Sequence, residues 1–126
     1  QFTTNSLNCF AGLINLEELY LQTNKIATLH SKFFKNLSKL RGIYLNENNL
    51  KVLPREVFKF NKNLEKLGLG TNQLEKIDEE LFDDLKNLKW IDLRENKCID
   101  EEFGDYNTKS NLNLLQLKRN VRKYCR

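Results

Sequence analysis

Residues 64–74 read Leu-Glu-Lys-Leu-Gly-Leu-Gly-Thr-Asn-Gln-Leu, and this arrangement of apolar residues around one asparagine recurs every 24 residues. Each copy follows the pattern Leu-x-x-(Leu/Ile)-x-Leu-x-x-Asn-x-(apolar or Cys), without insertion or deletion between copies. A fixed period of this length indicates a repeat protein in which each copy is one structural unit. The four copies are Leu16-Leu19-Leu21-Asn24-Ile26, Leu40-Ile43-Leu45-Asn48-Leu50, Leu64-Leu67-Leu69-Asn72-Leu74 and Leu88-Ile91-Leu93-Asn96-Cys98.

Apolar and polar residues alternate inside each copy, which predicts a short strand with one buried face. One copy cannot bury its leucines alone, whereas stacked copies share a continuous core. We therefore expect strands near residues 18–20, 42–44, 66–68 and 90–92. A second apolar set has the same period and should stack as a spine behind the strands: Phe10, Phe34, Phe58 and Phe82.

An asparagine follows each expected strand, at the point where the chain turns inward. A buried amide must be hydrogen-bonded, and an asparagine side chain can serve backbone donors and acceptors of its own coil and the next. These positions therefore predict a structural ladder made of Asn24, Asn48, Asn72 and Asn96.

The repeat resembles the leucine-rich repeat in its 24-residue extracellular form, over about residues 10–98. This resemblance implies an α/β fold, a right-handed solenoid in which each unit gives one strand to a short curved parallel sheet. We divide the chain into a partial N-terminal repeat or cap (1–15), four repeats (16–98) and a C-terminal helical cap (99–126).

The C-terminal segment has apolar residues at helical spacing, which predicts a helix from about 111 to 124. A disulfide between Cys98 and Cys125 would close the loop that contains this helix and contribute roughly 3–4 kcal/mol. A cysteine at the junction of repeat and cap, paired with one after a helix, resembles a simplified C-terminal cap of the family. The residues after Cys98 most resemble those of small secreted insect members.

The N-terminal end leaves alternatives open. Residues 1–15 match the second half of a unit whose own strand is absent. Either the chain is a fragment, or residues 1–9 fold over the end of the core, or the open edge pairs with another molecule. Cys9 is either a buried free thiol or part of an intermolecular or cap disulfide.

Several features favour an extracellular, secreted protein. Disulfide use implies an oxidising compartment, and Asn36-Leu37-Ser38 is an acceptor sequence for N-glycosylation at Asn36. No apolar run approaches the roughly 18–20 residues that a membrane span needs. The net charge is +4, with acidic residues concentrated in 75–84 and basic residues in 118–126. The basic tail could meet an acidic partner or a sulfated glycan, or form the solvated face of a helix.

Catalysis has little support in the sequence, so we predict no enzyme and no cofactor. There is no glycine-rich phosphate loop and no Cys-x-x-Cys pair, and His30, the single histidine, lies at an expected convex turn. We therefore assign no catalytic, cofactor-binding or metal-binding residue. A nucleic-acid partner would require basic residues interleaved with aromatic ones on one face, and the expected concave face mixes acids with bases instead.

That concave face is the candidate site for a protein ligand, because exposed Trp, Tyr and Arg dominate interface energetics. Gly68 and Gly70 would leave a shallow dip between neighbouring side chains. The alternative is that Trp90 only covers the C-terminal cap and that the tyrosines support sheet packing. The predicted partner-binding residues are Tyr20, Tyr44, Lys66, Trp90, Asp92 and Arg94.

Two functional hypotheses follow. The family resemblance implies a secreted recognition or adhesion module, with invertebrate innate immunity as one setting. The alternative is a structural or self-assembling piece that forms homo-oligomers, or docks, through its open N-terminal edge or Cys9.

Overall fold

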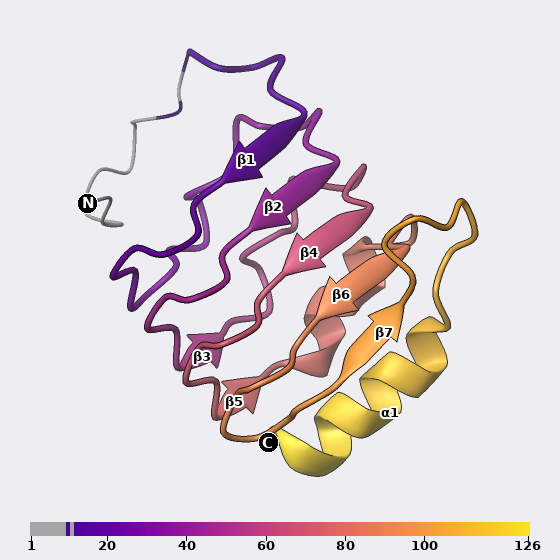
Figure 1. Cartoon of the computed structure of the whole chain (residues 1–126). Helices are drawn as coiled ribbons and strands as arrows, with labels where there is room; N and C mark the ends of the chain where they lie inside the picture. Colours follow the sequence, from indigo (N-terminus) through magenta and orange to yellow (C-terminus); the bar gives the residue numbers. More distant parts are fainter. Residues whose placement is uncertain (1–9, 11) are drawn as a thin grey trace.

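The computed structural model describes residue 10 and residues 12–126. Successive coils stack so that their strands lie side by side in one sheet (Figure 1). The strands pair in parallel with a register of 24 residues, which aligns Leu19 with Ile43 and Ile43 with Leu67. The expected strands and the α/β repeat solenoid are thus confirmed: β1 (Glu18–Tyr20), β2 (Gly42–Tyr44), β4 (Lys66–Gly68) and β6 (Trp90–Asp92).

A fifth strand that the sequence did not predict completes the sheet. Strand β7 (Glu102–Gly104) pairs antiparallel with β6, giving the order β1-β2-β4-β6-β7. The chain reverses after the fourth repeat, and Leu93 N donates to Glu101 O at 2.9 Å. Gly104 has φ +77°, and a Cβ there would collide with the Lys89 carbonyl, so the end of β7 requires glycine.

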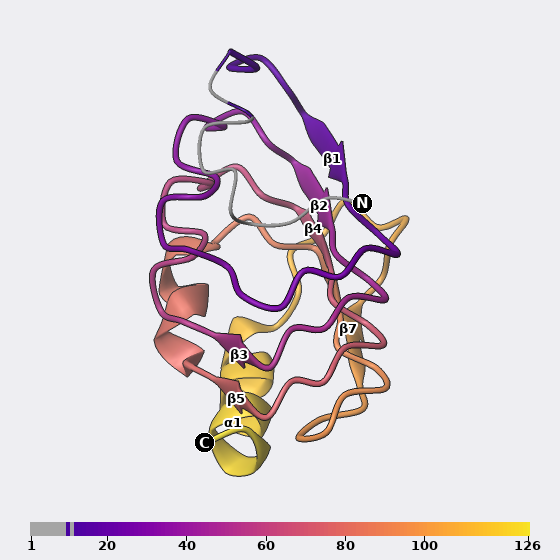
Figure 2. The same ribbon diagram turned by 90° about the vertical axis from the view of Figure 1, so that its left-hand side faces the viewer.

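Short elements form the side opposite the main sheet (Figure 2). Strands β3 (Val52–Leu53) and β5 (Lys76–Ile77) make a small parallel pair. The 3₁₀ helix η1 (Glu79–Asp84) follows, and the side chain of Asp78 caps it by accepting from Glu80 N at 3.0 Å.

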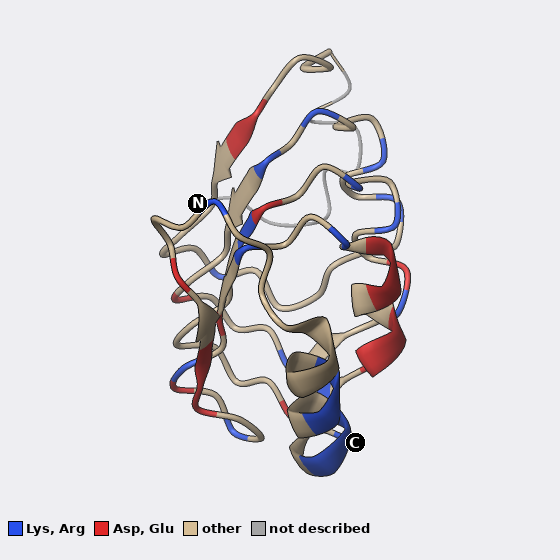
Figure 3. Cartoon of the chain, turned by 90° about the vertical axis from the view of Figure 1, so that its right-hand side faces the viewer, with Lys and Arg blue, Asp and Glu red and all other residues tan. Residues whose placement is uncertain are grey.

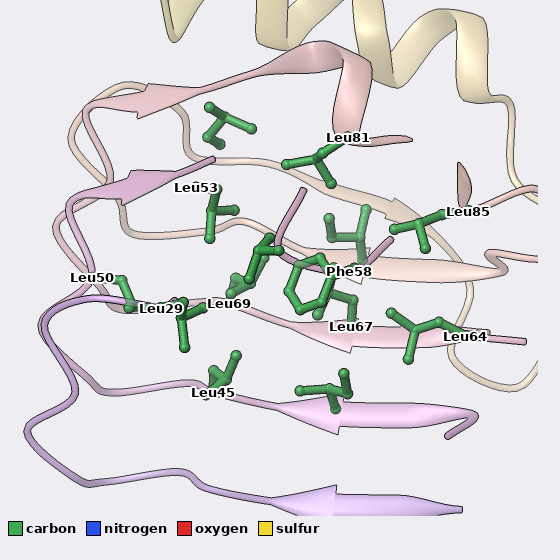
Figure 4. Close-up of a cluster of buried hydrophobic side chains, with 14 of the residues drawn as sticks. Leu29, Leu45, Leu50, Leu53, Phe58, Leu64, Leu67, Leu69, Leu81 and Leu85 are labelled. Atoms are coloured by element: carbon green, nitrogen blue, oxygen red, sulfur yellow. The ribbon is translucent and has the colours of Figure 1, made fainter. Parts of the chain in front are cut away.

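The core lies between the two sides, where leucines from the strands meet leucines and phenylalanines from the convex turns (Figure 4). Phe34, Phe58 and Phe82 are fully buried. The rings of Phe34 and Phe58 stack with centroids 5.9 Å apart. Each coil therefore covers the apolar side chains of the next, as stacking requires.

The C-terminal helix α1 (Leu114–Tyr124) covers the last coil. It begins three residues later than predicted because Asn113 is its N-cap, accepting from Gln116 N at 3.1 Å. Leu117 and Val121 are fully buried against the core, whereas Leu115 is exposed. Among the described helices, none is long and apolar enough to cross a membrane.

A ladder of alternating charges runs across the coils at the start of the strands. Arg41 lies 3.7 Å from Glu17 and 3.1 Å from Glu65, and Lys89 lies 3.9 Å from Glu65. The hydrogen bond from Arg41 is the main cause that lowers the pKa of Glu65. Adjoining coils therefore meet through opposite charges along this flank.

Candidate functional site

A row of aromatic side chains crosses the concave face of the sheet. Tyr20 of β1 and Tyr44 of β2 are register partners, so their rings stack with centroids 4.8 Å apart. Tyr20 is 61% exposed, whereas Tyr44 is buried. The row thus has an open end at β1.

Tyr106, which follows β7, extends this row, and sequence reasoning missed it. Its hydroxyl lies 3.1 Å from the hydroxyl of Tyr44, and the edge of its ring meets Trp90 at 5.1 Å between centroids. Lys66 Nζ lies 3.9 Å from the centroid of the Tyr106 ring, a cation–π contact. Tyr106 remains 40% exposed. The only signal in the sequence was an aromatic residue inside a polar turn.

Trp90 and Tyr44 face the concave side as predicted, but the expectation that they are exposed is wrong. Trp90 is 7% exposed, and its Nε1 donates to Glu102 at 2.6 Å. The cause is the unpredicted strand β7 and the turn after it, which lie over the C-terminal part of the face. Trp90 therefore packs between the sheet and the C-terminal cap, which agrees with the alternative that it serves the cap rather than an exposed binding site.

Asp92 is likewise buried, which corrects its assignment as an exposed binding residue. It accepts from the backbone N and Nε of Arg94, both at 3.0 Å, and Asn46 Nδ2 donates to it at 3.4 Å. The hydrogen bond to Asp92 raises the pKa of Arg94, whose guanidinium is exposed. The positive charge of Arg94 is therefore the one that faces solvent, while the carboxylate of Asp92 lies beneath it.

The dip expected at Gly68 and Gly70 is filled in part by a neighbouring side chain. A Cβ at Gly68 would collide with Asn46 Oδ1, and one at Gly70 would crowd Asp92 and Asn46. Asn46 therefore fills the space at Gly68, whereas a hollow remains beside Gly70, Asp92 and Arg94.

Tyr44, in the middle of the aromatic row, is not poised to act as a base. Burial is the main cause that raises the pKa of Tyr44 far above its usual value, and its hydrogen bond with Tyr106 adds to this. The phenol therefore stays protonated at physiological pH. No group of three or more His, Cys, Asp or Glu residues is placed to hold a metal ion in the part of the chain that the structure describes.

The asparagines after the strands form a hydrogen-bonded ladder inside the solenoid. Asn48 Oδ1 accepts from Ile26 N at 3.0 Å, and its Nδ2 donates to the carbonyls of Leu21 and Leu45. Asn72 and Asn96 repeat these bonds one and two coils further along. Asn24 donates to carbonyls of its own coil. The preceding residues all have positive φ, between 53° and 59°: Thr23, Glu47, Thr71 and Glu95.

A disulfide joins Cys98 and Cys125, so it ties the end of α1 to the last repeat. Ile77 N donates to Cys125 O at 2.9 Å, which adds β5 to this junction. Asn36 is exposed on a convex turn, and its glycosylation stays a prediction. Cys9 and the predicted cover by residues 1–9 lie outside the described residues.

The basic tail meets the acidic segment of the same chain. Lys118 of α1 pairs with Asp83 of η1, and Arg122 pairs with Glu79 through two bonds of 2.8 and 2.9 Å. Figure 3 shows α1, blue in its later turns, beside the largely red η1. Much of the charge on this face of α1 therefore serves to hold the cap.

Substituting Arg122 with glutamine should weaken the cap in a pH-dependent way. The hydrogen bond from Arg122 is the main cause that lowers the pKa of Glu79 below its usual 4.5. A lowered carboxyl pKa stabilises the fold above pH 4.5, and this contribution is lost as the pH falls through the folded-state pKa. Urea unfolding at pH 7 should show a slightly lower midpoint for R122Q than for the unsubstituted chain.

The difference between R122Q and the unsubstituted chain should shrink as the pH falls below 4.5, because Glu79 then takes up a proton and the ion pair weakens. Arg119→Gln is the matched control, since Arg119 is exposed on α1 and has no ion pair among residues 12–126. A difference in stability between R122Q and the unsubstituted chain that does not shrink as the pH is lowered would contradict this role of the Arg122–Glu79 pair.

Comparison with known proteins identifies the repeat. A family model described as "Leucine rich repeat" matches residues 14–74 and 62–101. The chain belongs to the leucine-rich repeat family. No curated protein sequence matches this leucine-rich repeat chain, whereas many solved structures do.

Three solved leucine-rich repeat structures illustrate the likeness. The leucine-rich repeat domain of APL1B is 28% identical, with TM-score 0.69 over 72% of this chain and 28% of that one. Toll, in its Drosophila complex with Spatzle, is 27% identical, with TM-score 0.65 over 70% of this chain and 12% of that one. A Leptospira interrogans protein is 31% identical, with TM-score 0.61 over 88% and 24%. The chain thus spans well under a third of each structure.

Proposed function

We propose that this leucine-rich repeat chain is a non-enzymatic extracellular recognition module that binds a protein ligand through its concave face. The contact surface, here called the concave surface, consists of Tyr20, Lys66, Arg94 and Tyr106. The observation that carries the proposal is the aromatic row: its inner members are buried and fixed, while Tyr20 and Tyr106 stay open to solvent.

Rigid aromatic residues and arginine are the side chains that contribute most to protein interfaces. Tyr20 is held by stacking on Tyr44, and Tyr106 by Tyr44, Trp90 and Lys66. Little side-chain entropy is therefore lost when a partner covers them.

The size of the face limits the kind of interface. Strands about 4.8 Å apart make a strip only roughly 20 Å wide, whereas a stable interface covers about 800 Å² on each partner. The ligand therefore also contacts the exposed turns that follow the strands, including Gln22 and Glu47.

The setting that we propose is extracellular, with innate immunity of an invertebrate as the first candidate. The disulfide supports an oxidising compartment. The solved complex of Toll with Spatzle, a molecular hub in Drosophila development and innate immunity, supports a recognition role by similarity.

The test uses an array of purified secreted proteins and ectodomains, probed with the disulfide-intact chain. For any ligand found, Tyr20→Ala/Tyr106→Ala should weaken binding by roughly 10- to 100-fold. Tyr124→Ala is the matched control, because Tyr124 is 51% exposed on α1, away from the concave face. A ligand that tolerates the concave double substitution but is lost with Tyr124→Ala would exclude this site.

One observation favours self-association as a second function. Leu13 is 49% exposed, whereas its register equivalents Leu37 and Leu85 are fully buried. Ile14 is 57% exposed at a position where other coils carry Ser38 or Lys62. Light scattering should show an oligomer that Leu13→Lys/Ile14→Lys dissociates and Leu115→Lys does not. A monomer at all concentrations would argue against this function.

A further inference from the structure

The convex side carries a cluster of lysines that the concave surface does not involve. We call it the convex lysine patch, and its members come from three successive coils. Lys35 and Lys59 are 24 residues apart and so lie in adjoining coils, and the same holds for Lys62 and Lys86. The patch consists of Lys35, Lys39, Lys59, Lys62 and Lys86, all of them exposed.

These charges are largely unneutralised. Lys35, Lys62 and Lys86 have no ion pair within the described part of the chain, residues 12–126. Lys59 lies 3.9 Å from Glu56, a weak exposed pair. Lys39 donates to the neutral Asn15 at 2.8 Å.

The acids near the patch do not cancel it. Besides Glu56, the neighbouring coil contributes Asp84 of η1, which is exposed. Glu17 and Glu65 line a hollow with Lys39, but both pair with Arg41. The next acid of η1, Asp83, already pairs with Lys118. Figure 3 shows the blue convex turns above the red η1, with blue α1 on the other side of it. Glu79 and Asp83 of η1 thus pair with α1 and Glu80 pairs with Arg55, while the lysines of the patch stay exposed.

An exposed aromatic ring lies within the patch. Phe60 is 38% exposed, and Lys59 Nζ lies 5.2 Å from its ring centroid. The register equivalents Asn36 and Asp84 are polar, so the repeat pattern does not require an aromatic residue here. A phenylalanine beside cations suits a ligand that offers both anionic groups and an apolar ring face, as a sulfated sugar does.

We propose that the convex lysine patch binds a linear sulfated glycan. Exposed like charges held together by the fold repel one another, and a polyanion relieves this repulsion and releases its own counterions. Lysines suit dispersed sulfates as point charges, whereas bidentate phosphate recognition favours arginine. Only one aromatic residue accompanies the lysines, too few for the stacking that single-stranded nucleic acid requires.

The disulfide favours a glycan over an anionic membrane as the partner of the convex lysine patch. Disulfides persist in oxidising compartments, whereas the anionic leaflet of membranes faces the cytoplasm. The patch also replaces the basic tail as the glycan site, because Lys118 and Arg122 of that tail are engaged with η1.

The test measures binding of immobilised heparin to the disulfide-intact chain at 50 and 150 mM NaCl. All proteins carry Asn36→Gln, so that the parent and the variants present the same convex surface. Lys35→Gln/Lys59→Gln/Lys62→Gln should weaken binding by roughly 30-fold at 150 mM NaCl and flatten its salt dependence. The matched control removes the same charge from α1 with Arg119→Gln/Lys123→Gln/Arg126→Gln and should lose less than about threefold.

Three further probes distinguish the polyanions: desulfated heparin, a single-stranded oligonucleotide of equal charge, and phosphatidylserine vesicles. Binding to heparin alone, lost on desulfation, supports the proposal. It is overturned if the parent protein does not bind heparin at 150 mM NaCl, or if the α1 variant loses as much affinity as the patch variant. It is also overturned if the oligonucleotide or the vesicles bind as tightly as heparin through the same lysines.

Discussion

Replacing Asn72 with alanine should lower the free energy of unfolding by about 2–4 kcal/mol, because one buried backbone N–H loses its acceptor and two buried carbonyls each lose one of two donors. Asn72 is 8% exposed. It accepts from Leu50 N at 3.1 Å and donates to the carbonyls of Leu45 and Leu69 at 3.0 and 3.1 Å. Leu45 O keeps a donor in Asn48 at 2.9 Å and Leu69 O keeps one in Asn96 at 3.1 Å, so the main loss falls on Leu50 N. Urea denaturation followed by circular dichroism measures the loss.

The control for Asn72→Ala is Asn63→Ala. Asn63 also donates to a carbonyl of the preceding coil, Ser38 O at 3.1 Å, but it is exposed, so water can take over that bond. It should cost less than about 1 kcal/mol. Equal losses for the two variants would show that the buried ladder adds nothing beyond a surface hydrogen bond.

Removing the disulfide should lower the melting temperature by roughly 10 °C, which corresponds to about 3–4 kcal/mol. The bridge closes a loop of 27 residues that contains β7, the Tyr106 turn and α1. Without it the unfolded chain gains freedom, and the helix is held by Leu117, Val121 and its ion pairs to η1. Cys98→Ala/Cys125→Ala, measured by calorimetry, tests this.

The disulfide experiment is best done in a Cys9→Ala background, so that no third thiol can exchange with the bridge. The parent in that background is the control, and treating it with reductant should reproduce the loss seen in the double variant. A melting temperature that changes by less than 2–3 °C on reduction would mean that packing alone holds the cap.

The strands could be predicted to the residue because a strict period fixes the register. Once Leu67 is assigned to a buried face, Leu19, Ile43 and Ile91 follow by subtraction or addition of 24. The ladder asparagines follow in the same way. Local propensity played little part, since the strands are only three residues long.

The site was predicted less well because part of it comes from residues outside the period. Nothing in the segment after Cys98 indicates that it turns back as β7 and places Tyr106 over Trp90. Trp90 is therefore buried by a segment whose position does not follow from the 24-residue spacing of the repeats. The orientation of side chains on the sheet was predictable, but what covers them was not.

Asn61 shows how far the period can be relaxed inside the core. It occupies the position of Leu37 and Leu85 and is fully buried. Its Nδ2 donates to the carbonyls of Phe34 and Leu37, both at 3.0 Å, while its Oδ1 has no partner among the described residues. A polar residue is accepted there because the adjoining coil offers backbone acceptors, which a pattern of apolar positions does not reveal.

The flank on which Glu17, Arg41, Glu65 and Lys89 alternate constrains how a chain of this kind can change in size. Excising a single 24-residue unit between Glu17 and Glu65 would bring these two carboxylates face to face, whereas excising two would leave Glu17 beside Lys89. Variants shortened or lengthened by pairs of units should therefore keep the flank attractive, and odd changes should not. The order of charges thus favours the duplication or deletion of an even number of units within this array.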